Sequence, residues 1–280
     1  MGAHRSKPWI LLLVLAGCNQ TVAPRGPQFN LPLTIEGRSA GNALVDTGAE
    51  GELILADSYG LPVVGSVPII LFSGAMEAGL TAPFTYTVAG VQLRTSGAIV
   101  RDSNCACDAL GTGFFRRAGT CVRLDYRDGS AALVDRIPDG GIEVPLAPSL
   151  NNSGPFTSAH IPVQINELTF ADAILDTGAN VTAVRALLMP PGSADTYLRL
   201  SHYVLGALSV PQARVLTYET EGLPDVIIGT DLMRAWGSVW YFSFSESGGR
   251  AATFRTSPTA SDSALSGQNA GALLQPGMPN

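Results

Sequence analysis

The sequence predicts an all-β protein built from two similar halves. The tripeptide Asp-Thr-Gly occurs at residues 46–48 and again at 176–178, and each copy ends a short apolar run. The same offset of 130 residues aligns 31–35 with 161–165, where apolar and polar residues alternate as in half-buried strands. Glycine and proline are frequent, with 31 and 19 residues, and long amphipathic helix patterns are missing from the sequence.

The N-terminal residues predict export. Two basic residues precede an apolar run at 9–14, and Leu-Ala-Gly-Cys follows at 15–18. The run is too short to span a bilayer, and the pattern resembles the box of bacterial lipoproteins. That resemblance implies a signal peptide at 1–17, lipid on Cys18 and a tether at 18–28, with the protein anchored in the bacterial cell envelope on its periplasmic or outer-surface side. The alternative is an ordinary signal peptide that happens to end in cysteine.

The charge of the chain disfavours nucleic acid as a partner. The sequence has 17 Lys plus Arg against 23 Asp plus Glu, and loss of Arg5 and Lys7 with the signal peptide would change the net charge from −6 to −8. Lys7 is the only lysine in the sequence. A mature chain without lysine excludes Schiff-base chemistry and a P-loop.

Three cysteines follow Cys18 in the sequence. In an oxidising compartment we expect one disulfide, between Cys121 and either Cys105 or Cys107, and one odd thiol. The predicted mature chain has only two histidines to add to these cysteines, which is too few for a typical metal site. We therefore expect no metal.

Strand-like runs occur in both halves and are separated by turn residues. The halves are expected at 29–146 and 159–256, and a Pro-, Asn- and Ser-rich linker at 147–158. One short helix is predicted at 111–117, and a disordered tail rich in Ser, Ala, Gly and Pro at 257–280. Strands are predicted at 31–35, 43–45, 67–72, 84–88, 91–100, 122–126, 142–146, 161–165, 197–205, 213–218 and 239–244.

The two tripeptides and their surroundings resemble the aspartic proteases with Asp-Thr-Gly signatures, of both the two-lobed pepsin type and the one-lobed retroviral type. Each lobe of that family also carries an apolar pair and a glycine that opens a short helix. Residues 227–234 (Ile-Ile-Gly-Thr-Asp-Leu-Met-Arg) match this pattern closely, and 110–116 (Leu-Gly-Thr-Gly-Phe-Phe-Arg) match it loosely. The likeness covers residues 29–255.

The segments between each tripeptide and its helix are short for a pepsin lobe and close to a retroviral-type lobe. The resemblance therefore implies a bilobal acid-protease fold, with two retropepsin-like lobes related by a pseudo-twofold axis. It implies that Asp46 and Asp176 face each other, share one proton and activate a water molecule between them. Supporting roles in the two loops are implied for Thr47, Gly48, Thr177, Gly178, Gly111 and Gly229.

Alanine follows both tripeptides, at Ala49 and Ala179. Many acid-active relatives have serine there, whose hydroxyl donates to a carboxylate and favours the ionised form. Because alanine cannot donate, we expect the pKa values of the two aspartates to be higher and the activity optimum to be mildly acidic to neutral.

The first half departs from the family pattern. Glu52 stands where the family has Thr or Ser, whereas Thr182 fits in the second half, and Gly113 stands where the other copy has Asp231. Glu50 adds a second acid near the first loop. These acids could repel acidic substrates, bind a basic residue near the cut, or be solvated loop charges.

A flap that closes over the substrate is expected at 72–79, between two strand-like runs. The second flap is expected either at 190–195 or in the hairpin around 205–207. An alternative for each segment is a plain hairpin. The substrate-contacting residues expected in the first flap are Phe72, Ser73, Gly74, Ala75 and Met76.

The resemblance implies a lipid-anchored aspartic endopeptidase that acts as a monomer on a polypeptide substrate, without a cofactor. The alternative is a non-catalytic, peptide-binding envelope lipoprotein with the same fold.

Overall fold

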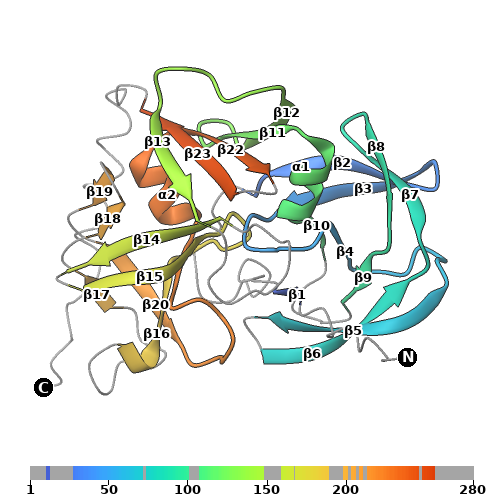
Figure 1. Ribbon diagram of the computed structural model, residues 1–280, viewed down its shortest axis with the longest axis horizontal. Coiled ribbons are helices and arrows are strands. Elements are labelled where there is room, and N and C mark those ends of the chain that lie inside the picture. Colours follow the sequence, from blue (N-terminus) through green and yellow to red (C-terminus); the bar gives the residue numbers. More distant parts are fainter. Residues whose placement is uncertain are drawn as a thin grey trace, which may run out of the picture.

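The computed structural model describes residues 11–12, 28–71, 74–100, 107–147, 159–166, 168–188, 198–200, 203–205, 208–210, 213–245 and 248–255. These residues form three sheets and two short α-helices (Figure 1). The protein is therefore mostly β-structure, as the sequence predicts.

The first half forms a ten-stranded sheet in the order β1-β5-β6-β9-β4-β10-β3-β2-β7-β8. Its strands are β1 (Leu11–Leu12), β2 (Asn30–Ile35), β3 (Arg38–Val45), β4 (Leu53–Leu55), β5 (Val63–Leu71), β6 (Gly74–Thr81), β7 (Phe84–Val88), β8 (Val91–Thr95), β9 (Ala98–Ile99) and β10 (Asp108–Leu110).

The second half forms an eight-stranded sheet in the order β17-β20-β16-β21-β15-β14-β18-β19. Its strands are β14 (His160–Ile165), β15 (Leu168–Leu175), β16 (Ala183–Arg185), β17 (Leu198–Leu200), β18 (Tyr203–Leu205), β19 (Leu208–Val210), β20 (Ala213–Tyr218) and β21 (Val226–Ile228), with a 3-10 turn at Ala186–Leu188.

The two halves repeat the same pairings around the two tripeptides. In the first half β3 pairs with β2 antiparallel and with β10 parallel, and β10 pairs with β4 antiparallel. In the second half β15 pairs with β14 antiparallel and with β21 parallel, and β21 pairs with β16 antiparallel. Each unit ends in a seven-residue helix, α1 (Thr112–Ala118) or α2 (Thr230–Trp236). The duplication and both short helices are confirmed.

A third sheet joins the halves. It has five strands in the order β12-β11-β22-β23-β13, and Figure 1 shows it along one side of the molecule, next to both halves. Strands β11 (Cys121–Asp125), β12 (Ser130–Val134) and β13 (Ile142–Leu146) precede the second tripeptide, whereas β22 (Val239–Ser245) and β23 (Gly248–Phe254) end the described chain. Its buried aromatic residues pack on one another and on α1, since the ring of Phe244 lies 6.3 Å from those of Phe242 and Phe115.

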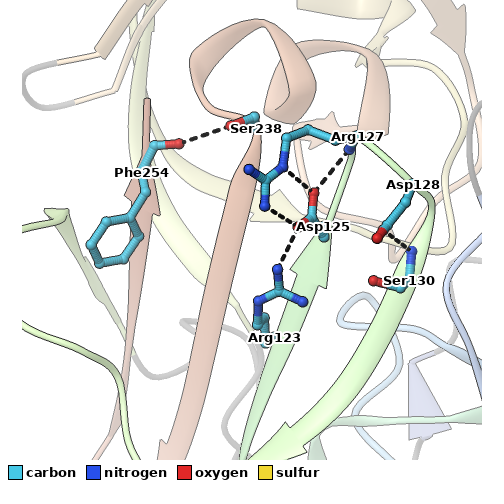
Figure 2. A network of polar contacts seen from close by, with 7 residues as sticks. All are labelled: Arg123, Asp125, Arg127, Asp128, Ser130, Ser238 and Phe254. Carbon is cyan, nitrogen blue, oxygen red and sulfur yellow. Dashed lines mark hydrogen bonds and ion pairs between the residues drawn. The ribbon is translucent and has the colours of Figure 1, made fainter. Parts of the chain in front are cut away.

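A buried carboxylate fixes one end of this sheet. Asp125 ends β11 and is 1% exposed, and its carboxylate accepts hydrogen bonds from the Arg123 and Arg127 guanidinium groups (Figure 2). The hydrogen bond from Arg127 is the main reason that the pKa of Asp125 is lowered to about 2. Beside it, Tyr126 N donates to Ser238 O at 2.8 Å, which ties the β11–β12 turn to the start of β22.

Two predicted strands are wrong in extent. The run 91–100 is split into β8 and β9, because the chain turns at Ser96 and Gly97. A Cβ at Gly97 would lie 3.0 Å from Leu55 Cδ1, so the turn packs directly on β4. The run 197–205 is likewise divided between β17 and β18.

The expected disulfide is not formed in the structure. Cys121 is buried and has a free thiol, whose Sγ lies 3.9 Å from the carbonyl oxygen of Asp135. Pairing with Cys105 or Cys107 is therefore wrong for this structure, and Cys105 itself lies outside the described residues.

Several predictions for the chain ends concern residues that the structure does not describe, including Cys18 and 257–280. Within the predicted signal peptide, residues 11–12 form β1 and pair in parallel with Ile69 and Ile70 of β5. Of the described helices, none is long and apolar enough to cross a bilayer.

Candidate active site

The two Asp-Thr-Gly loops meet between the halves. We call residues 46–52 the first loop and 176–182 the second loop. Each loop follows a buried strand, β3 or β15, and each aspartate N–H donates to the neighbouring parallel strand, at Leu110 O or Ile228 O, over 2.9 Å. The same local pairing therefore presents both aspartates at the ends of equivalent strands.

The threonines cross from one half to the other. Thr47 Oγ1 donates to Leu175 O and Thr177 Oγ1 donates to Val45 O, both over 2.6 Å. Each hydroxyl also accepts from the opposite threonine N–H, at 3.0 and 3.1 Å. These four buried hydrogen bonds join the loops reciprocally. The two threonines, for which the resemblance implies a supporting role, therefore hold the loops together.

The two carboxyl groups have equivalent surroundings. Asp46 Oδ1 accepts from Gly48 N at 2.9 Å and Ala49 N at 3.1 Å, and Asp176 Oδ1 accepts from Gly178 N at 2.8 Å and Ala179 N at 3.2 Å. Both Oδ2 atoms are buried, and neither has a hydrogen-bond donor among the described residues. One proton shared between the two carboxyl groups would supply the missing donor.

Gly48 and Gly178 allow this close approach. A Cβ at Gly48 would lie 2.5 Å from Asp176 Cγ, and one at Gly178 would lie 2.7 Å from Asp46 Cγ. Each carboxyl group therefore packs on the backbone of the opposite loop, where only glycine leaves room.

The pKa values of both aspartates are raised. Burial is the main cause for Asp46, and the negative charge of Asp176 adds to it, so the pKa of Asp46 is well above its ordinary value. Burial also raises the pKa of Asp176, to about 7, against hydrogen bonds that favour its ionised form. The pair therefore holds a proton at pH values where isolated carboxyl groups have lost theirs.

Gly111 and Gly229 lie under the loops. A Cβ at Gly111 would lie 2.1 Å from Gly51 O, and one at Gly229 would lie 2.5 Å from the carbonyl of Val181. Thr112 N and Thr230 N donate over 2.8 Å to Ala49 O and Ala179 O. Any side chain at these two glycines would push the loop away from its helix.

The halves fix their loops to their helices in different ways. In the second half, Thr182 Oγ1 donates to Asp231 Oδ1 at 2.8 Å and accepts from Gly229 N at 3.1 Å. In the first half, Glu52 instead binds Arg117 of α1 through both carboxylate oxygens, at 3.0 and 2.9 Å. Gly113 packs closely under this loop, since a Cβ there would lie 3.0 Å from Gly51 O. The first half therefore links its loop and helix by an ion pair where the second half uses a Thr–Asp hydrogen bond.

Glu50 is not a solvated loop charge. It is fully buried, and its Oε1 lies 4.0 Å from Nε2 of His160, which is 2% exposed and begins β14 in the other half. For Glu52, the ion pair with Arg117 replaces free solvation. The solvated alternative is thus wrong for Glu50. The short distance in sequence from Asp46 was the only signal that this acid lies near the site.

The first flap candidate is a β5–β6 hairpin. Leu71 pairs with Gly74, so Gly74, Ala75 and Met76 lie in strand β6 rather than in a loop, and Phe72 and Ser73 are outside the described residues. The hairpin reaches the second half, because a Cβ at Gly222 would lie 2.6 Å from the Ile70 Cδ1 atom.

For the second flap, the stretch 190–195 is outside the described residues, whereas β18 and β19 form a hairpin that pairs Leu205 with Leu208. Among the described residues, no group of three or more His, Cys, Asp or Glu side chains is arranged to hold a metal ion.

Comparisons with known proteins find similarity to solved structures and none to a family model or a curated protein. No protein-family model matches the sequence, and a comparison with curated proteins finds no match. A solved structure of basic 7S globulin from soybean matches 81% of this chain and 92% of its own, with a TM-score of 0.47 and 8% sequence identity. The repeated pairings and the crossed threonines place the two aspartates together. The fold is therefore a duplicated, mostly β fold in which the two Asp-Thr-Gly loops meet between the halves.

Replacing Thr177 with valine should destabilise the protein by about 2–4 kcal/mol, because it leaves Val45 O and Thr47 N buried without a hydrogen bond. Thr177→Ser keeps the hydroxyl and is the matched control, expected to lose at most about 1 kcal/mol. Urea unfolding measures both. Equal losses in the two variants would contradict a role for the hydroxyl.

Asp46→Asn should stabilise the protein at neutral pH, because ionisation of the buried Asp46 carboxyl group opposes folding. The amide oxygen still accepts from Gly48 and Ala49, while a buried charge is removed. Because the folded-state pKa is raised, the folded wild type binds more protons than the unfolded chain, and its stability falls as pH rises above the ordinary carboxyl range. The stability that Asp46→Asn gains over the wild type should therefore become smaller as the pH falls towards about 4.

Asp125→Asn is the control with the opposite sign. The pKa of Asp125 is lowered, so its charge stabilises the fold above the ordinary carboxyl pKa, and that contribution is lost as pH falls towards about 2. This variant should be less stable than wild type at neutral pH. Unfolding curves at two pH values test both variants, and a loss of stability in Asp46→Asn at neutral pH would contradict the assignment.

Proposed function

We propose that the protein is an aspartic-type endopeptidase, which hydrolyses peptide bonds with a water molecule activated between Asp46 and Asp176. The observation that carries this proposal is the pair of equivalent carboxyl groups, each held by two loop N–H groups and each with a buried Oδ2 that no described donor contacts. A pair that shares one proton contains both a general base and a general acid.

The chemistry follows from that protonation state. The ionised carboxylate removes a proton from water as the oxygen attacks the peptide carbonyl carbon, and the protonated carboxyl donates to the carbonyl oxygen. The tetrahedral intermediate collapses with transfer of a proton to the amide nitrogen, which breaks the C–N bond and releases a carboxylic acid and an amine. The crossed threonines would keep the two carboxyl groups in register during both steps.

An extended peptide with apolar side chains is the proposed substrate. The edge of β5 that faces away from β6 pairs with the extended apolar residues Leu11–Leu12. A substrate peptide could pair with this edge in the same way, through backbone hydrogen bonds. Met76 in β6 packs with the small apolar core beside the first loop. Both features support recognition of a strand-like polypeptide.

We also propose that the enzyme is a monomer, because one chain supplies both aspartates, and that lipid on Cys18 holds it in the bacterial cell envelope. The lipid anchor rests on residues 1–18 alone. Detergent extraction followed by intact-mass measurement would detect the added lipid, and an unmodified, freely soluble mature chain would contradict it.

A second candidate is a non-catalytic peptide-binding lipoprotein. The departures of the first half, with Glu52 and Gly113 in place of the family residues, favour this alternative. Both candidates would bind an extended peptide, but only the protease would cut it.

Asp46→Asn and Asp176→Asn should each lower kcat by at least about 10³-fold, because neither variant can form a carboxylate pair that shares a proton. Cleavage-site profiling of a peptide library with the soluble mature protein measures this, and Asp128→Asn at an exposed turn serves as the control. We call Asp46 and Asp176 together the dyad. A pepstatin-type inhibitor, which mimics the tetrahedral intermediate, should bind the wild type more tightly than the Asp46→Asn or Asp176→Asn variant. Substantial turnover by either variant would remove the shared-proton mechanism.

The pH–rate profile should have a mildly acidic to neutral optimum. The reaction needs a single proton on the pair. Because burial raises the pKa values of both carboxyl groups, the singly protonated pair occurs at higher pH than it would for two ordinary carboxyl groups, and activity should fall at low pH, where both groups are protonated. Ala49→Ser would introduce a donor to the Asp46 carboxylate and should shift the profile to lower pH. An optimum near about pH 2–3 in the wild type would contradict this reasoning.

A further inference from the structure

A buried pair of ionisable side chains connects the first loop to the opposite half. Glu50 is fully buried and His160 is 2% exposed, and their Oε1 and Nε2 atoms are 4.0 Å apart. This distance is too long for a direct hydrogen bond, but it places the two ionisable side chains next to each other inside the protein. The pair is far from water and joins residues 110 positions apart in the chain.

Both members lie next to the hydrogen bonds that hold the dyad. Glu50 follows Ala49, whose N–H donates to Asp46 Oδ1 and whose carbonyl accepts from Thr112 N and Oγ1. His160 pairs with Ile174 in β15, one residue before Leu175, whose carbonyl accepts from Thr47 Oγ1. A displacement of Glu50 would therefore reach Asp46 through Ala49, and a displacement of His160 would reach Thr47 through Ile174 and Leu175.

The pair exists on one side of the dyad only. The offset of 130 residues relates Glu50 to Asn180 and His160 to Asn30. Asn30 is exposed on β2 and donates to Gln28 O, and Asn180 is partly buried. The equivalent positions therefore carry neutral amides. The Glu50–His160 pair is a difference between the surroundings of the two loops.

We propose that Glu50 and His160 are positioning residues, whose contact across the halves holds the first loop against the second half and fixes the Asp46 carboxyl group relative to Asp176. This inference rests on the proposed protease function. Only the first loop is held in this way. The loops that carry Asp46 and Asp176 are therefore restrained differently, although the two carboxyl groups accept equivalent hydrogen bonds.

The test is a double-mutant cycle with Glu50→Gln, His160→Gln and the double variant, measured in the mature protein. Each single variant should lower kcat by about tenfold or more with KM within about twofold, because the pair orders the dyad and does not touch substrate. The double variant should be no slower than the slower single variant, since the two residues act as one unit. Asn30→Gln, at the position equivalent to His160, is the matched control and should leave kcat unchanged.

A purely structural role would lower the melting temperature without changing kcat of the folded protein, and that result overturns the proposal. Single variants with kcat within about twofold of wild type, or effects that multiply independently in the double variant, also overturn it. If neither single variant folds, the double variant decides, because wild-type kcat in a folded double variant removes the positioning role. If none of the three folds, the pair is structural and the proposal fails.

Failure of the proposed protease function can be distinguished from failure of the positioning role of Glu50 and His160. A wild type that cuts nothing overturns the protease assignment, whereas the same cycle read in pepstatin-type inhibitor affinity still reports whether the pair orders the dyad. Independent effects on affinity would overturn the pair in that case too.

Discussion

The crossed threonine hydrogen bonds are the constraint on which the rest of the structure depends. Each threonine hydroxyl donates to a carbonyl in the other half and accepts from the opposite threonine N–H. These bonds can form only when the two loops lie at the same height and face each other. Once they do, the glycines that follow leave room for the opposite carboxyl groups, and the buried strands behind the loops must end at matching positions. Loss of this link would separate the halves where their backbones are closest.

The carboxyl groups of Asp46 and Asp176 lower the stability of this arrangement. Burial raises the pKa values of both carboxyl groups, and the protein keeps them together at the cost of stability at neutral pH. The surroundings of the loops offset this cost. Helix α2 is fixed to the second loop through Thr182 and Asp231, and α1 is fixed to the first loop through Glu52 and Arg117. The two links use different chemistry to the same end, and α1 has Gly113 where α2 has Asp231. The two aspartates are thus held by packing of each loop on its helix.

The sequence contained enough to predict the architecture of the site, because two copies of one tripeptide in strand-like frames specify a duplicated fold. It also specified α1 and α2, where a glycine precedes an apolar helix. The three-residue strands β4, β10, β16 and β21 were not predicted, since three residues are too few to show a period. Burial of Glu50 could not be predicted either, because it depends on His160 from the other half. The free thiol of Cys121 follows from packing in the joining sheet, which cysteine counting does not register.

Fusion of the two halves in one chain permits a difference that two identical chains could not have. A symmetric dimer with one tripeptide per chain would place the same residue beside both aspartates, so a Glu–His pair on one side would require the same pair on the other. Here the equivalent positions are Asn180 and Asn30, and the two loops differ also in how they contact their helices. A mechanism that needs one ionised and one protonated carboxyl group benefits from such a difference, because unequal surroundings favour one arrangement of the shared proton over the other. The crossed threonine bonds bring the two acids together, and the unequal contacts around them would allow the two acids separate roles in the proposed reaction.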